Sequence, residues 1–174
     1  AFVGATLSMD AAHLLRGGAV GTQPVGVVAL STLILGLVVQ GFPEELLWRG
    51  YLIQTLPWRS PWAVTLFSAA LFGLLHLVSS GDQEGWGERI LYLFPAFSFA
   101  FLAGALYRAT GQLWAAVGVH AGMHFASGTL EYLGFGSGPA AWIAEGVAYC
   151  VAAIAIMVWL DRNRPGAGFP GDRP

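Results

Sequence analysis

Three charged residues stand close together directly after a long apolar run. Residues 25–40 are almost entirely apolar, and Glu44, Glu45 and Arg49 follow soon after. A charged side chain at the centre of a bilayer costs roughly 2.5–3.5 kcal/mol on insertion scales, and the packing of apolar helices does not require one. We therefore expect this cluster to belong to a functional site.

The spacing within the cluster separates the roles of its two carboxylates. Glu45 and Arg49 are four residues apart, so on an α-helix they share a face and can form an ion pair. Such a pair would brace the helix, or would only neutralise the charges so that the helix can enter the membrane. Glu44 lies about 100° further around the helix, which leaves it for general acid–base chemistry.

His76, in a second apolar run, is a candidate partner of Glu44. A glutamate and a histidine on neighbouring helices can hold one water molecule and remove its proton. At ~1.5 Å per residue, both residues lie roughly 23 Å from the turn between their helices. The alternative for His76 is a hydrogen-bonded packing residue.

His120 and His124 are also four residues apart and predict a shared helix face, roughly 15–21 Å deep by the same rise. They could be ligands of a divalent metal such as zinc, with Glu44 or His76 completing the site. Alternatively, they donate hydrogen bonds to a developing oxyanion. Position 121 is Ala, so the HExxH motif of zinc proteases is absent. Gly118 and Gly122 have GxxxG spacing, which predicts a close helix approach beside the histidines.

The composition is that of a membrane protein. Of the 174 residues, 56% are apolar and 10% are charged, and the mean hydropathy is +0.63. A soluble domain has about 25% charged residues. The eight basic residues are all Arg and are too few for a phosphate-binding surface, so we expect no nucleic-acid partner. The single cysteine, Cys150, excludes an internal disulfide.

The apolar runs predict an all-α, polytopic transmembrane helix bundle with about five spans plus a partial N-terminal helix. We expect residues 1–24 to form a partial or interfacial helix and a loop, residues 25–160 to form the intramembrane domain, and residues 161–174 to form a disordered polar tail. The expected spans are residues 25–56, 62–78, 90–107, 112–133 and 140–160. Arg59, Arg108 and the arginines of the tail fall on one side of these spans, which predicts that this side is cytoplasmic.

Three motifs in order resemble those of the CPBP intramembrane proteases, also called the CAAX prenyl protease 2 or Abi family. They are Glu44-Glu45-x-x-x-Arg49, Phe72-x-x-x-His76, and His120 followed four residues later by a polar residue. The resemblance covers about residues 30–127. It implies an integral, multi-pass protein of the bacterial cell membrane that acts on a membrane protein or a lipidated peptide.

The resemblance also implies roles for the motif residues. Glu44 and His76 would activate water, while His120 and the residue at position 124 would support the oxyanion. The family pattern has Asn or Asp at that last position, whereas this chain has His124. An imidazole can donate the same hydrogen bond and is also a potential metal ligand.

The sequence thus predicts intramembrane hydrolysis of a peptide bond in a membrane-associated or C-terminally modified protein or peptide. The catalytic residues would be Glu44, His76, His120 and His124, with Glu45 and Arg49 as a brace, and no cofactor is expected. One alternative is a metal-dependent protease that uses Glu44, His76, His120 and His124 as ligands. Others are a non-catalytic immunity or scaffold protein, and a small proton-relaying transporter.

Overall fold

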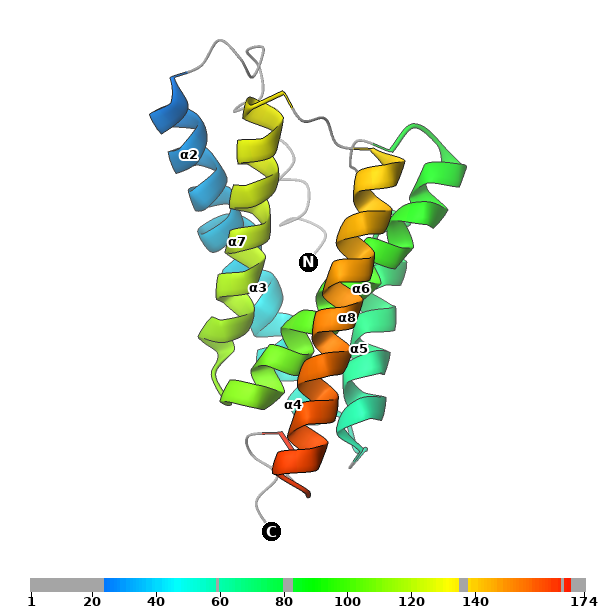
Figure 1. The fold of residues 1–174 in the computed structure, drawn as a ribbon. Coiled ribbons are helices and arrows are strands. Elements are labelled where there is room, and N and C mark those ends of the chain that lie inside the picture. Colours follow the sequence, from blue (N-terminus) through cyan, green and yellow to red (C-terminus); the bar gives the residue numbers. More distant parts are fainter. Residues whose placement is uncertain (1–23, 59, 80–82, 135–137, 167, 170–174) are drawn as a thin grey trace. The chain divides into compact units, whose positions relative to one another are not determined.

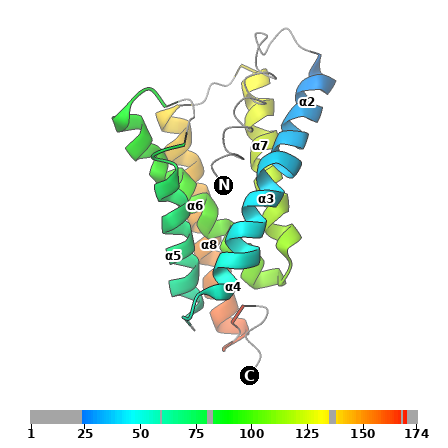
Figure 2. The ribbon, with the colours of Figure 1, turned by 180° about the vertical axis from the view of Figure 1, so that it is seen from behind.

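A computed structural model describes residues 24–58, 60–79, 83–134, 138–166 and 168–169. These residues are folded as helices joined by short connections, with no strand among them, as the sequence predicts. Residues 1–23, for which we expect a partial helix, lie outside the described part. The helical elements, drawn in Figures 1 and 2, are α2 (Val25–Ile34), η2 (Leu35–Gly41), α3 (Phe42–Glu45), η3 (Leu46–Leu52), α4 (Ile53–Thr55), α5 (Pro61–Leu75), α6 (Trp86–Thr110), α7 (Leu113–Tyr132) and α8 (Pro139–Asn163).

The helices are those of an integral membrane protein. Three of them are long and apolar enough to cross a bilayer: the continuous helix Val25–Thr55, and the helices Trp86–Thr110 and Pro139–Asn163. Pro61–Leu75 is apolar but shorter. Each of the five predicted spans coincides with a helix, and among the described residues three helices have the length and apolarity of a full span.

Residues at the helix ends explain where several helices begin and end. Ser60 accepts a hydrogen bond from the Ala63 N–H, and Pro61 occupies the first turn, which is a favourable start for α5. Gly111 ends α6 in the left-handed conformation (φ 70°), and its N–H donates to the Tyr107 carbonyl. The start of α5 and the end of α6 thus lie within a few residues of the ends of the spans predicted at residues 62–78 and 90–107.

The first long helix contains π-helical turns on both sides of Pro43. Proline has no N–H and cannot donate the usual helical hydrogen bond. In η2 the chain adopts wider turns, and the Phe42 N–H donates to the Leu37 carbonyl, five residues back. A Cβ at Gly41 would collide with the Gly36 carbonyl oxygen, so this position at the end of η2 requires glycine. The helical winding is therefore altered on both sides of Pro43.

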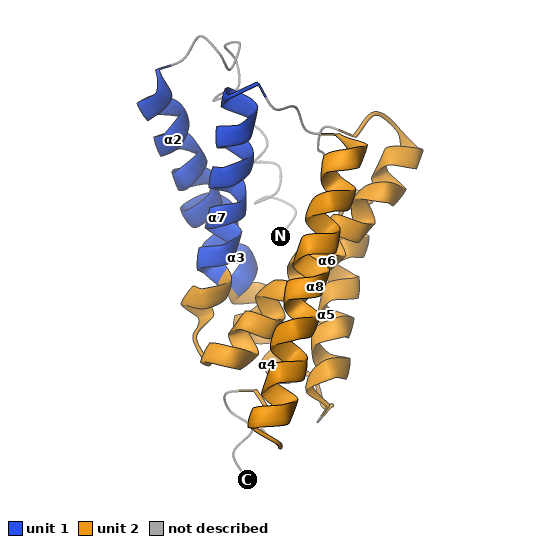
Figure 3. Ribbon diagram, in the orientation of Figure 1, with its two compact units in different colours: residues 1–45, 117–137 blue, residues 46–116, 138–174 orange. Residues whose placement is uncertain are grey.

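The chain divides into two compact units (Figure 3). Unit 1 comprises residues 1–45 and 117–137, and unit 2 comprises residues 46–116 and 138–174. The boundary falls between Glu45 and Leu46, within the first of the three motifs.

Unit 1 is built on close antiparallel packing of the first helix against α7, which lie side by side in Figures 1 and 2. A Cβ at Gly36 would lie 2.8 Å from the His124 Cβ and 3.1 Å from the Ala121 backbone. Further along, Thr32 packs on Gly128. At Gly118 and Gly122, no other element among the described residues lies within 4 Å of an added Cβ, so the close approach that their spacing permits stays a prediction. The small residue of this contact is Gly36, on the opposite helix.

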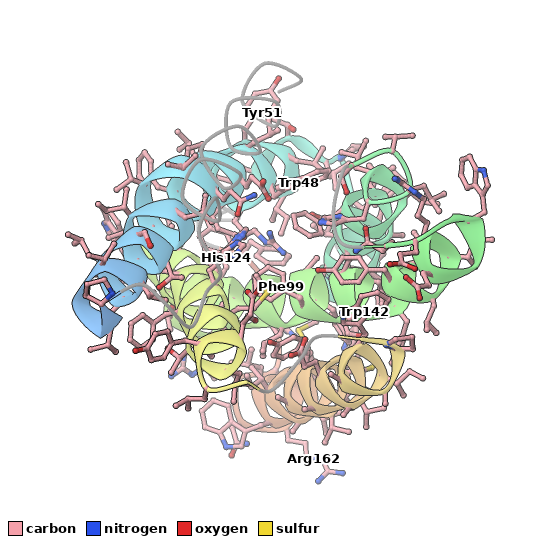
Figure 4. All side chains as sticks on the ribbon, turned by 90° about the horizontal axis from the view of Figure 1, so that it is seen from above. Trp48, Tyr51, Phe99, His124, Trp142 and Arg162 are labelled. Carbon is pink, nitrogen blue, oxygen red and sulfur yellow. The ribbon has the colours of Figure 1, made fainter. Side chains whose placement is uncertain are left out.

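Unit 2 packs α5 and α8 against the buried face of α6. Near one end of α6, the buried Arg108 donates to Asp161 of α8 at 2.8 Å, and Trp62 of α5 donates to the same carboxylate at 2.7 Å. Asp161 thus joins three helices. In Figure 4, Arg162 points away from the body of unit 2, whereas Trp142 lies on the side of α8 toward α6.

Of residues 161–174, which we expect to form a disordered polar tail, the structure describes residues 161–166 and 168–169. Helix α8 continues through Asn163, beyond the predicted end at residue 160. Phe169 is buried with Ile53 and Val64, and its ring stacks on Tyr107 with the centroids 6.0 Å apart. Phe169, which follows the Pro/Gly-rich turn, thus packs in the core of unit 2.

Candidate active site

Unit 1 contains a buried carboxylate–imidazole pair. Glu45, the last residue of α3, and His120 of α7 lie with Oε1 and Nδ1 2.9 Å apart, and both side chains are almost completely buried. The chain just before α3 also passes close to His120, since a Cβ at Gly41 would be in van der Waals contact with the His120 Cβ, at 3.5 Å.

His124 completes this group, which we call the unit 1 cluster (Glu45, His120 and His124). The two imidazole rings are stacked, with centroids 5.2 Å apart and planes at 18°. They lie one turn apart on α7, so the sequence prediction of a shared face is confirmed. His120 is buried and His124 is partly exposed.

The hydrogen bond to Glu45 constrains the chemistry of His120. An ionised carboxylate only accepts hydrogen bonds, so Nδ1 of His120 carries the proton and donates it. The other nitrogen, Nε2, then either donates from a charged ring or accepts from a neutral one. A carboxylate that holds a histidine in this way orients the ring and stabilises its charged form.

Unit 2 contains the other motif residues. Arg49 of η3 is fully buried, and its guanidinium donates a hydrogen bond to the Ala100 carbonyl of α6. It also lies over the Phe72 ring, 5.8 Å from the centroid, and the Trp48 ring contacts Phe72 edge-on at 5.5 Å. Arg49 therefore joins the first helix to α5 and α6 within this unit.

His76 lies at the C-terminal end of α5, and its ring is held by its own helix. Its Nδ1 lies 2.8 Å from the Phe72 carbonyl oxygen. That oxygen can only accept, so Nδ1 donates, and in the neutral ring Nε2 carries the lone pair. His76 with Phe72, Trp48 and Arg49 forms what we call the unit 2 cluster.

The structure thus brings together only some of the predicted residues. Glu45, His120 and His124 meet in unit 1, while Arg49 and His76 are linked through Phe72 in unit 2. Glu44 is half-buried in α3 of unit 1. Glu44 and His76 belong to different units, and so do Glu45 and Arg49. The water-holding pair Glu44–His76 and the ion pair Glu45–Arg49 therefore stay predictions.

The bond between Glu45 and His120 was missed by sequence reasoning, which assigned Glu45 only to Arg49. That assignment assumed α-helical winding, in which residues four apart share a face. Residues 46–52 are π-helical, with hydrogen bonds that reach five residues instead of four. The predicted depths of Glu44, roughly 23 Å, and of the His120–His124 pair, roughly 15–21 Å, were the one signal that Glu45 could also reach these histidines.

The metal-dependent alternative stays a prediction. Within the described residues there is no group of three or more His, Cys, Asp or Glu side chains placed to hold a metal ion.

A sequence model of the family described as type II CAAX prenyl endopeptidase, Rce1-like, matches residues 26–126. The match covers more than half of the chain and includes every residue of both clusters. The chain belongs to the Rce1-like family. Searches of curated proteins and of solved structures gave no match. Membership identifies the chain as an integral membrane CAAX endopeptidase, in agreement with its apolar helices.

Proposed function

We propose that this Rce1-like protein hydrolyses a peptide bond in a membrane-associated or C-terminally modified protein or peptide, within a bacterial cell membrane that it crosses several times. Glu44 and His76 activate the water, and His120 and His124 stabilise the oxyanion. The observation that carries the proposal is the buried Glu45–His120 pair, 2.9 Å apart. Burying such a pair among apolar helices is costly, and packing does not require it, so its presence supports a functional role.

The unit 1 cluster supports the role of oxyanion stabilisation. When the Glu45 carboxylate holds Nδ1–H, the charged ring of His120 presents Nε2–H as a fixed donor. Preorganised donors in a site without water stabilise a developing negative charge strongly, because they need no reorientation during the reaction. His124, stacked on His120, can supply a second donor from the same face of α7.

The unit 2 cluster supports the role of water activation. His76 donates from Nδ1 to a neutral backbone carbonyl, so Nε2 of the neutral ring has the lone pair of a group that can accept a proton or a hydrogen bond. In the proposed reaction, Glu44 takes the proton of the attacking water while His76 orients that water. Glu44 then returns the proton to the leaving amine, and Arg49 holds the helix that carries Glu44.

A metal-dependent form of the same hydrolysis is the second candidate, and the Glu45–His120 bond favours it as well. A carboxylate that receives Nδ1–H is the usual outer partner of a metal-bound histidine, and it leaves Nε2 of a neutral ring as the ligand. Metal analysis of the purified protein separates the two. Stoichiometric metal together with loss of cleavage after chelation would support this candidate over the metal-free one.

The test of the proposal is cleavage of a prenylated peptide that ends in a CAAX sequence by the purified protein in lipid vesicles. We expect Glu44→Gln to abolish measurable cleavage, because an amide cannot take the proton of water. Glu131→Gln, the same change at an exposed residue of α7, serves as the control and should cleave like the unmodified protein. Normal cleavage by a folded Glu44→Gln protein would contradict the proposal.

A further inference from the structure

The end of α5 needs support because His76 lies at the point where the helix stops. The last helical residue is Leu75, and the chain continues in tight turns in which the N–H groups of Leu77 and Val78 donate three residues back. The final carbonyl groups of a helix have no partner within the helix. A side chain from elsewhere must supply donors if the segment around His76 is to keep one conformation.

Arg89, in the first turn of α6, supplies these donors. Its Nη1 donates to the Leu77 carbonyl at 3.1 Å and to the Ser79 carbonyl at 2.9 Å. The Ser79 hydroxyl in turn donates to the His76 carbonyl at 3.2 Å. A positive charge at this end of α5 also interacts favourably with the helix dipole. The backbone immediately after His76 is therefore fixed to α6.

Tyr92, three residues after Arg89 on α6, contacts the ring of His76. The two ring centroids are 5.9 Å apart, and on its own helix His76 also contacts the Phe72 ring at 4.7 Å. Tyr92 is itself packed edge-on against Trp142 of α8 at 5.2 Å. Trp142 is buried, and Figure 4 shows it on the α6 side of its helix. The ring of His76 is thus backed by three helices of unit 2.

We propose that Arg89 and Tyr92 are positioning residues for His76: Arg89 holds the backbone at the end of α5, and Tyr92 holds the imidazole ring. The proposal rests on the proposed role of His76 in activating water. Both residues lie on one turn of α6, outside the three motifs. A shift of that turn would therefore move His76 without direct contact with any other residue of the proposed site.

The first test observes the ring of His76 directly. The chain contains four histidines, so ¹⁵N-labelled histidine in the full-length protein gives few signals, which single substitutions assign. We expect Arg89→Met to shift or broaden the His76 signals and to leave those of His120 and His124 unchanged. Arg164→Met is the matched control, since Arg164 also donates to a backbone carbonyl, that of Ala109, at the opposite end of α6. It should leave the His76 signals unchanged.

The second test is kinetic and uses the prenylated CAAX peptide. A misplaced catalytic group costs up to about a hundredfold in rate, so Arg89→Met should lower kcat roughly ten- to a hundredfold with KM within about twofold. Arg89→Lys should restore part of kcat, because an ammonium group can still donate to the carbonyls. Tyr92→Leu should displace the His76 signals more than Tyr92→Phe, which keeps the aromatic ring.

The outcomes separate the two proposals. Unchanged His76 signals in both Arg89→Met and Tyr92→Leu would overturn the positioning role, whatever the activity. Normal cleavage by His76→Ala would overturn the proposed role of His76, even if Arg89→Met still displaced its ring. Equal effects of Arg89→Met and Arg164→Met on the His76 signals would also overturn the positioning role.

Discussion

The two clusters hold their histidines in different ways. In unit 1, Nδ1 of His120 donates to a side-chain carboxylate on another helix, whereas in unit 2, Nδ1 of His76 donates to a neutral carbonyl one turn back on its own helix. His120 is almost completely buried, while His76 is partly exposed at a helix end. Two histidines are thus held by different partners, His120 by a carboxylate and His76 by a neutral carbonyl.

This difference teaches how one residue type can serve two roles. A carboxylate partner stabilises the charged imidazole, which suits a hydrogen-bond donor to an oxyanion. A neutral carbonyl partner fixes the tautomer without favouring the charge, which suits a group that accepts a proton or orients water. We therefore expect substitutions in the two clusters to have different effects.

Within the unit 1 cluster, the largest effect is expected at His120. Removing one oxyanion donor typically lowers kcat by about 10²–10³ in proteases. His120→Ala should fall in that range, and steady-state cleavage of the prenylated CAAX peptide measures it. Unchanged turnover in a folded variant would remove His120 from the mechanism.

A smaller effect is expected at Glu45. Glutamine keeps the shape and can still accept the proton of Nδ1, but it replaces a charged hydrogen bond with a neutral one. The difference between these bonds is about 1 kcal/mol, so Glu45→Gln should lower kcat roughly five- to tenfold. Glu131→Gln is again the control. If both variants cleave at the same rate, Glu45 does not act through His120.

Sequence reasoning located the helices but not the side chains that meet between them. The apolar runs fix where helices form because their length and composition must match a bilayer. The partner of Glu45 depends on the π-helical winding around Pro43 and on the approach of α7, and neither leaves a spacing signal. For the same reason, the spacing of the glycines beside His120 did not indicate the close contact that Gly36 makes on the other helix.

The smallest expected effect concerns the stability of unit 1. Gly36→Ala places a Cβ 2.8 Å from the His124 Cβ, and such overpacking costs typically about 1–3 kcal/mol. Gly118→Ala adds the same methyl group where nothing in the described chain lies within 4 Å, and alanine is favoured over glycine in a helix by about 0.5–1 kcal/mol. The midpoint temperature of thermal unfolding in detergent should therefore fall for Gly36→Ala and rise for Gly118→Ala. A lower midpoint for Gly118→Ala than for Gly36→Ala would contradict the packing described for unit 1.

The most direct test of the account compares kcat of His76→Gln with kcat of His120→Gln on the prenylated CAAX peptide. A glutamine amide can donate a hydrogen bond but cannot take a proton at neutral pH. If His120 is only a hydrogen-bond donor and His76 assists Glu44 in removing the proton of water, His120→Gln should retain at least about ten times more activity than His76→Gln, since the general base catalysis to which Glu44 and His76 contribute together is worth roughly 10²–10⁴. Equal loss in the two variants, or greater activity in His76→Gln, would contradict the division of roles between the two clusters.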